Sequence, residues 1–313
     1  MNKTKTMPHL WKWQLLAVLP ALLAAPNGMF VKIVTDDVSA VWLNVLRFFV
    51  SALIVLPFVI MARRRFTKKN LKYAVFSGLA YGVAVLSYTQ AISLSQASYV
   101  SVINLGIPIF LMVYSVYFTK ERVSRRALLG ISFAALGSFI VVAAPLLFSG
   151  GVTSTFHPLA TILALVNCAF FPLSVIMTKK ANEEGLPISA SFGVSSTIIF
   201  LLSLFVALVT GIAPPVEVFM NNPVLLLPVL YSAILVYVVA KSITVASYRY
   251  IGSVAVGALQ YLESFLSIIL PIIILGERMT LEMLIGGLLI LVGVIVSELK
   301  LFPNRKRPEM EAL

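Results

Sequence analysis

One carboxylate, Glu263, lies near the middle of an apolar stretch that runs from residue 253 to residue 275. At a helical spacing of three to four residues it shares one face with polar or small residues, namely Ser253, Gly257, Gln260, Ser264, Ser267 and Pro271. Lipid offers such a face no hydrogen-bond partner, so we expect it to line protein or a water-filled cavity. Three roles are open for the carboxylate: counter-ion to a buried cation, proton coupling, or contact with a cationic group of a ligand.

Two cations also lie inside apolar stretches, Arg47 and Lys241. A buried arginine either binds a ligand carboxylate or holds helices together through carbonyls and hydroxyls. Lys241 is about four residues from the end of its stretch, so its ammonium either reaches the membrane surface or enters the protein interior. A ligand with a carboxylate and an ammonium would match Lys241 and Glu263 together.

Aromatic and amide side chains extend this set. Tyr81 and Tyr88 are seven residues apart and share a helix face, whereas Tyr237 precedes Lys241 by one turn. The remaining candidates for a ligand-binding cavity are Asn104, Asn167, Phe171, Gln260 and Tyr261.

The composition is that of a membrane protein with many crossings. Of the 313 residues, 60% are hydrophobic and 12% are charged, with a mean hydropathy of +1.00, which is more apolar surface than a soluble fold can bury. Ten stretches are long and apolar enough to cross a bilayer: residues 13–34, 38–61, 71–94, 97–119, 127–148, 157–178, 188–212, 223–247, 253–275 and 281–299. The sequence therefore predicts an all-α integral membrane protein with ten transmembrane helices.

The distribution of Lys and Arg predicts the orientation. Twenty of the 24 basic residues fall in the two terminal segments and in the loops on the same side of the membrane. By the positive-inside rule both termini are cytoplasmic, in a multi-pass protein of the cytoplasmic membrane. The net charge of +12 therefore reflects topology and contact with anionic membrane lipids, and nucleic acid is not expected as a partner.

The chain also repeats itself after a shift of 156 residues. Glu121-Arg122 then aligns with Glu277-Arg278, and two glycines of each half align: Gly130 with Gly286 and Gly137 with Gly293. Because each copy contains five crossings, the second enters the membrane in the opposite sense. We therefore expect two inverted five-helix repeats, residues 1–148 and residues 149–313 with a basic tail, as in secondary transporters with a midplane site.

These features resemble the drug/metabolite transporter superfamily, in particular its EamA-type members. The resemblance rests on the Glu-Arg-x-Ser/Thr turn that precedes the glycine-spaced last span of each half, on Arg47 within WLNVLRFFVSALIVLP, and on the run YTQAISLSQASYVSVIN at residues 88–104. It implies that the third and eighth spans surround the cavity, and that Arg47 has a structural role because the family shares it. The first span departs from the family, since Ala25-Pro26-Asn27-Gly28 stands where a Trp-Gly pair is typical.

The expected function is secondary active transport of a small polar metabolite by alternating access. The net positive core favours an amino acid or a related zwitterion, and the alternative substrate is choline or another organic cation held by Glu263 and aromatic rings. A passive channel or a membrane-embedded lipid enzyme is less consistent, because no filter sequence or catalytic cluster is present. The sequence also has no phosphate-binding loop, no metal-binding motif and no second cysteine, so we expect no enzymatic activity, cofactor or metal. We expect the protein to be a monomer or a homodimer.

Overall fold

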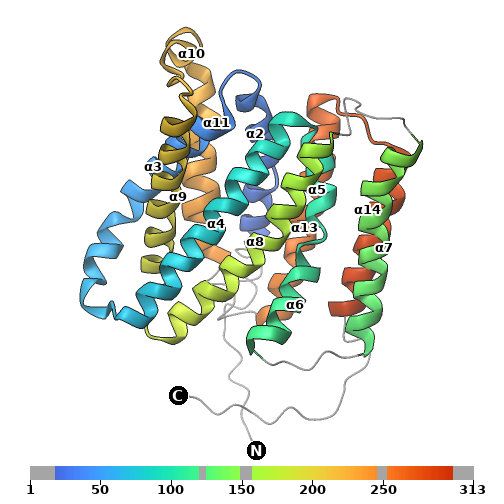
Figure 1. Ribbon diagram of the computed structural model, residues 1–313, viewed down its shortest axis with the longest axis horizontal. Helices are drawn as coiled ribbons and strands as arrows, with labels where there is room; N and C mark the ends of the chain where they lie inside the picture. The colour runs from blue at the N-terminus through green and yellow to red at the C-terminus, as the bar shows by residue number, and fades with distance from the viewer. Residues whose placement is uncertain (1–17, 120–124, 149–156, 245–251, 299–313) are drawn as a thin grey trace, which may run out of the picture.

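The fold is described by a computed structural model that covers residues 18–119, 125–148, 157–244 and 252–298 (Figure 1). Within these ranges all regular structure is helical and no strand occurs. The elements of the first half are α2 (Asn27–Thr35), α3 (Ala40–Met61), η1 (Arg63–Arg65), α4 (Lys68–Leu94), α5 (Ala97–Asn104), α6 (Ile107–Thr119) and α7 (Arg125–Phe148). Those of the second half are α8 (Pro158–Glu183), α9 (Ile188–Thr210), α10 (Val216–Asn221), η2 (Pro223–Leu225), α11 (Leu226–Leu230), η3 (Tyr231–Ala240), α13 (Gly252–Leu275) and α14 (Leu281–Glu298).

Six helical segments of the described residues are long and apolar enough to cross a membrane. They are Val18–Thr35, Ala40–Met61, Lys68–Leu94, Pro158–Glu183, Ile188–Thr210 and Pro223–Thr244. Shorter apolar stretches, Ala97–Leu111, Ser132–Val141, Leu262–Leu275 and Leu281–Gly293, lie at the other four predicted positions. The multi-pass helical class is thus confirmed, and the number of ten crossings stays a prediction.

The predicted span at residues 97–119 consists of two helices, α5 and α6, with a break between them. Helix α5 ends in tight turns, in which the N–H of Leu105 donates to Val102 O and the N–H of Gly106 donates to Ile103 O. Pro108 follows in the first turn of α6, where its missing N–H costs nothing. The break therefore falls at residues 105 and 106, inside the bundle.

Helices α7 and α14 lie side by side at one edge of the molecule (Figure 1). A Cβ added to Gly137 would be 2.5 Å from the carbonyl oxygen of Gly286, and one added to Gly293 would be 2.4 Å from that of Gly130. In the 156-residue alignment Gly137 corresponds to Gly293, and Gly130 corresponds to Gly286. The two contacts are therefore the same contact with the two helices exchanged, as a two-fold axis between them requires. This reciprocity is the relation expected of inverted repeats, and the two repeats and their division after residue 148 stay predictions.

Helix α4 packs on α8 and α9 and carries the first residues of the candidate site. Its glycines make this possible, because a Cβ on Gly78 or Gly82 would lie 2.7 Å from Ile198 or Leu202 of α9. Toward α8, the hydroxyl of Ser77 is 2.8 Å from Ser174 O, to which it donates. Small residues on two sides of α4 thus fix its rotation and direct Tyr81 toward α8.

Candidate functional site

Lys241 lies on a group of aromatic rings inside the bundle. Its Nζ is 4.4 Å from the ring centroid of Tyr81, 5.3 Å from that of Phe171 and 6.0 Å from that of Tyr237. These rings come from α4, α8 and η3, and the rings of Tyr81 and Phe171 are themselves 5.7 Å apart in an edge contact. The ammonium therefore points toward internal helices, where cation–π attraction is strong because water is scarce.

The segment before Lys241 is a π-helix, η3, where the sequence indicated an ordinary helix. The N–H of Lys241 accordingly donates to the carbonyl of Val236, five residues earlier. A π-helix widens the turn and changes the direction of the side chains that follow it, and such segments are frequent at functional sites. Here it places Tyr237 and Lys241 on the same aromatic group.

Arg47 of α3 also contacts this aromatic group. Its Cζ is 5.2 Å from the ring centroid of Tyr237 and 5.3 Å from that of Phe48, and the side chain is 0% exposed. None of its three guanidinium nitrogens has a hydrogen-bond partner among the described residues. Hydrogen bonds to carbonyls and hydroxyls, which the expected structural role requires, are therefore not formed here, and that role stays a prediction. A buried guanidinium without partners is costly and is suited to accept an anionic one.

Glu263 of α13 contributes a negative charge that interacts with Lys241. It interacts electrostatically with Lys241, Tyr81 and Tyr88, although no ion pair joins it to Lys241 within the described residues. One turn later, the hydroxyl of Ser267 donates to Glu263 O at 2.8 Å and to Ala25 O at 3.1 Å. The polar face of α13 therefore contacts the first span at Ala25.

Asn104 and Asn167 are brought together at the break between α5 and α6. The Nδ2 of Asn167 donates to Asn104 Oδ1 at 2.8 Å, and the neighbouring Cys168 Sγ donates to Ile103 O at 3.4 Å. Asn167 precedes Phe171 by one turn of α8, so this amide pair adjoins the rings around Lys241. It supplies hydrogen-bonding groups beside the charged ones.

Tyr88 lies about two helical turns after Tyr81 in α4 and faces the first span. A Cβ on Gly28 would be 3.0 Å from the Tyr88 hydroxyl, so the small glycine allows a close approach of the two residues. The neighbouring Asn27 accepts a hydrogen bond from Ser232 at 3.0 Å. The Asn-Gly sequence in the first span thus packs around the candidate site.

The structure therefore brings most of the predicted residues together. Tyr81, Phe171, Tyr237 and Lys241 form one aromatic group with Arg47, while Glu263 and Tyr88 interact with its members electrostatically. The side chains of Gln260 and Tyr261 lie outside the described residues. Sequence reasoning missed Phe48, whose ring is 4.6 Å from that of Tyr237, because no pattern separates it from the exposed Phe49 beside it.

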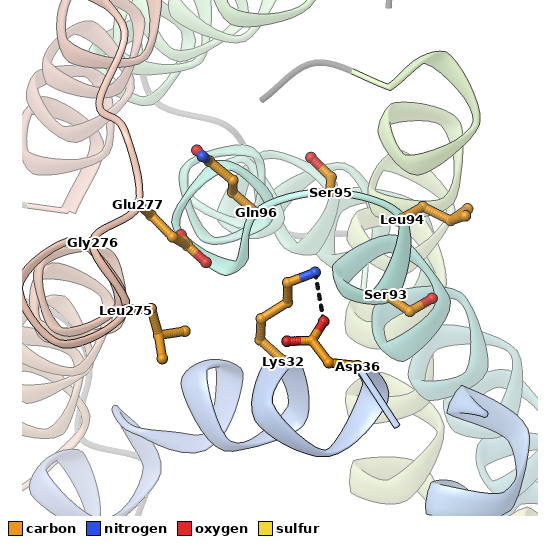
Figure 2. Close-up of a pocket in the computed structure, with 9 residues that line it drawn as sticks. All are labelled: Lys32, Asp36, Ser93, Leu94, Ser95, Gln96, Leu275, Gly276 and Glu277. Atoms are coloured by element: carbon orange, nitrogen blue, oxygen red, sulfur yellow. Dashed lines mark ion pairs between the residues drawn. The ribbon is translucent and has the colours of Figure 1, made fainter. Parts of the chain in front are cut away.

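A second polar cluster closes the end of the bundle that is predicted to be extracellular. The Oε1 of Glu277 accepts from the N–H of Ala97 at 2.8 Å, and its Oε2 accepts from the N–H of Ser98 at 2.8 Å and from the Ser98 hydroxyl at 2.5 Å. The carboxylate thus caps the N-terminus of α5 across the two halves. Figure 2 shows it beside a cavity of about 380 Å³ near the Lys32–Asp36 ion pair, whose Nζ and Oδ1 are 3.1 Å apart.

The Glu277 cap leads to a stability prediction. Glu277→Gln keeps an oxygen acceptor but loses the charge and one of the paired hydrogen bonds, so we expect a loss of about 1–2 kcal/mol in the free energy of unfolding. Thermal unfolding in detergent is expected to shift down by a few degrees. The exposed Asp37→Asn is the matched control, and an equal shift for both variants would contradict the capping role.

Comparison with known proteins places these features in a family. The model of the EamA-like transporter family matches residues 11–143 and 158–299. An uncharacterized transporter of Clostridium kluyveri is 23% identical over 260 residues, 80% of each chain. An uncharacterized transporter from the cobO 3' region of Sinorhizobium sp is 25% identical over 135 residues, 41% of this chain and 95% of that protein.

A solved crystal structure has the same fold. It superposes with a TM-score of 0.60 at 16% identity and covers 91% of this chain and 96% of its own. This likeness concerns the fold alone.

Proposed function

Because the chain belongs to the EamA-like transporter family, whose match spans both halves, we propose that it is a secondary active transporter that works by alternating access. Its substrate is a small polar metabolite, and it works in the cytoplasmic membrane with both termini in the cytoplasm. Residues of both halves form the candidate site, with Tyr81 and Arg47 from the first and Lys241 and Phe171 from the second. A site between two repeats is the place where rocking of the halves exposes a substrate to each side in turn.

The observation that carries the substrate assignment is the pair of interior cations on one aromatic group. Arg47 and Lys241 both lie over the ring of Tyr237, and Arg47 has no hydrogen-bond partner among the described residues. With Glu263 as the nearby anion, the group carries one net positive charge. A substrate carboxylate removes the penalty of the unpaired guanidinium, and a substrate ammonium pairs with Glu263. An amino acid or a related zwitterion carries both groups.

The second candidate is choline or another organic cation. Tyr81, Phe171 and Tyr237 form the kind of ring group that binds such a cation, but the ammonium of Lys241 already lies 4.4 Å and 5.3 Å from two of these rings. An added cation would have to displace Lys241 and would be repelled by it and by Arg47. The geometry therefore favours the zwitterion.

Enzymatic activity has less support than transport. The relatives are named as transporters, which is consistent with a protein that is not an enzyme.

A thermal-shift screen tests the substrate assignment. Purified protein is heated with zwitterionic amino acids, with choline-like cations or with nucleosides, and the screen is repeated on Glu263→Gln. We expect a zwitterion to raise the melting temperature of the unchanged protein by mass action, and the substitution to remove this shift because the substrate ammonium loses its partner.

The matched control is Glu217→Gln, an exposed carboxylate in the first turn of α10. It removes the same charge from an exposed position outside the candidate site, so the zwitterion should still raise the melting temperature. A shift that survives unchanged in Glu263→Gln would show that this carboxylate does not bind the substrate. A shift with choline-like cations alone would favour the second candidate.

A further inference from the structure

A groove of about 670 Å³ lies between α4, α6 and α8, at the ends of these helices that are predicted to be cytoplasmic. Phe76 and Leu79 line its apolar part and are 48% and 45% exposed. Lys68, Lys72 and Lys180 line its other end, where α4 begins and α8 approaches its last turn. The groove therefore has one positive end and an apolar part that extends along α4 toward the membrane interior.

Only one of the lysines at this end pairs with a carboxylate within the part of the chain that the structure describes. The neighbouring Lys69 is paired with Glu184, with Nζ and Oε1 2.6 Å apart. No carboxylate forms such a pair with Lys68, Lys72 or Lys180 within the described residues. Three lysines thus line one groove without an anionic partner among the described residues.

Lys180 is held at the groove by two aromatic rings. Its Nζ is 4.9 Å from the ring centroid of Phe118 and 5.8 Å from that of Tyr73, and both rings line the groove. Cation–π contacts limit the directions open to the flexible side chain, so less freedom is lost when the ammonium binds an anion. This charge is in place before any ligand arrives.

We propose that this groove binds one anionic phospholipid of the cytoplasmic leaflet. The phosphate lies between Lys72 and Lys180, and an acyl chain follows Phe76 and Leu79 into the bilayer. A lipid with a net negative headgroup satisfies three ammonium groups, whereas a zwitterionic headgroup brings its own cation close to them. The site is separate from the substrate site and does not depend on the proposed transport function.

Native mass spectrometry of the detergent-purified full chain tests this proposal. The probes are phosphatidylglycerol and phosphatidylcholine with the same acyl chains. The unchanged protein is expected to retain one phosphatidylglycerol and to prefer it to phosphatidylcholine, and Lys72→Gln with Lys180→Gln should weaken this retention by about tenfold or more.

Two matched variants separate a built site from general charge attraction. Arg63→Gln with Arg64→Gln removes the same charge from exposed positions on the same side and should retain the lipid. Lys72→Arg with Lys180→Arg keeps the charge at the groove and should also retain it, which gives a second test if the glutamine variant does not fold. Equal losses in both glutamine variants, loss in the arginine variant, or equal binding of the two lipids would overturn the proposal.

Discussion

Arg47→Met is expected to raise the melting temperature of the ligand-free protein and to abolish its response to substrate. Arg47 is 0% exposed, and its guanidinium nitrogens have no hydrogen-bond partner among the described residues. Replacing a buried charge that has no hydrogen-bond partner by an apolar side chain of similar length is expected to stabilise the fold by about 1–3 kcal/mol. The same change removes the partner of the substrate carboxylate, which we expect to weaken binding by at least 100-fold, about 3 kcal/mol.

The sign of the change in the ligand-free melting temperature distinguishes a binding role of Arg47 from a structural one. If Arg47 holds helices together, Arg47→Met lowers the melting temperature of the ligand-free protein. The exposed Arg64→Met serves as the control for loss of a positive charge and should change neither quantity. Thermal unfolding with and without a stabilising zwitterion measures the ligand-free melting temperature and its increase on ligand binding. A lower ligand-free melting temperature together with an unchanged increase would contradict the assignment of Arg47 to the substrate site.

The second large effect is expected from Gly286→Ala. An added Cβ would lie 2.6 Å from the carbonyl oxygen of Gly137 and 2.4 Å from Cγ2 of Val141, so α7 and α14 would have to separate. Overpacking of this kind costs about 1–3 kcal/mol. We expect a clear decrease in melting temperature and in the yield of folded protein after extraction in detergent.

The adjacent Gly287→Ala is the matched control, because its Cβ would be 3.4 Å from the nearest atom, Cγ1 of Val102, which is closer to an ordinary contact. The two variants make the same chemical change on the same helix, one residue apart. Equal melting temperatures for them would show that the close approach of α7 and α14 does not contribute to stability.

Much of the fold followed from the sequence because its causes are local. Apolar length predicted the six segments that are long enough to cross a membrane. Asn104 and Asn167 were both candidate site residues, and a direct hydrogen bond joins them. Polar side chains in apolar helices must find partners, so their types and positions are informative.

Other features depend on tertiary contacts that a single sequence does not display. Gly106 and Pro108 permit a break between α5 and α6, but Pro172 lies inside the continuous α8, so proline alone does not separate the two outcomes. The π-helix before Lys241 has no local signal in a run of apolar residues. The roles of Phe48 in the site and of Glu277 as a cap for α5 depend on partners from distant helices.

The most direct test of the transport proposal is counterflow in proteoliposomes that contain the purified protein. Labelled neutral amino acids are added outside, with unlabelled amino acids, their methyl esters or choline inside. We expect only the unlabelled amino acids, which carry a carboxylate and an ammonium, to accelerate uptake of label, and Arg47→Met to abolish the acceleration. Acceleration by choline or the methyl esters in place of the amino acids, or uptake that is independent of internal solute, would contradict a zwitterion carrier built on Arg47, Lys241 and Glu263.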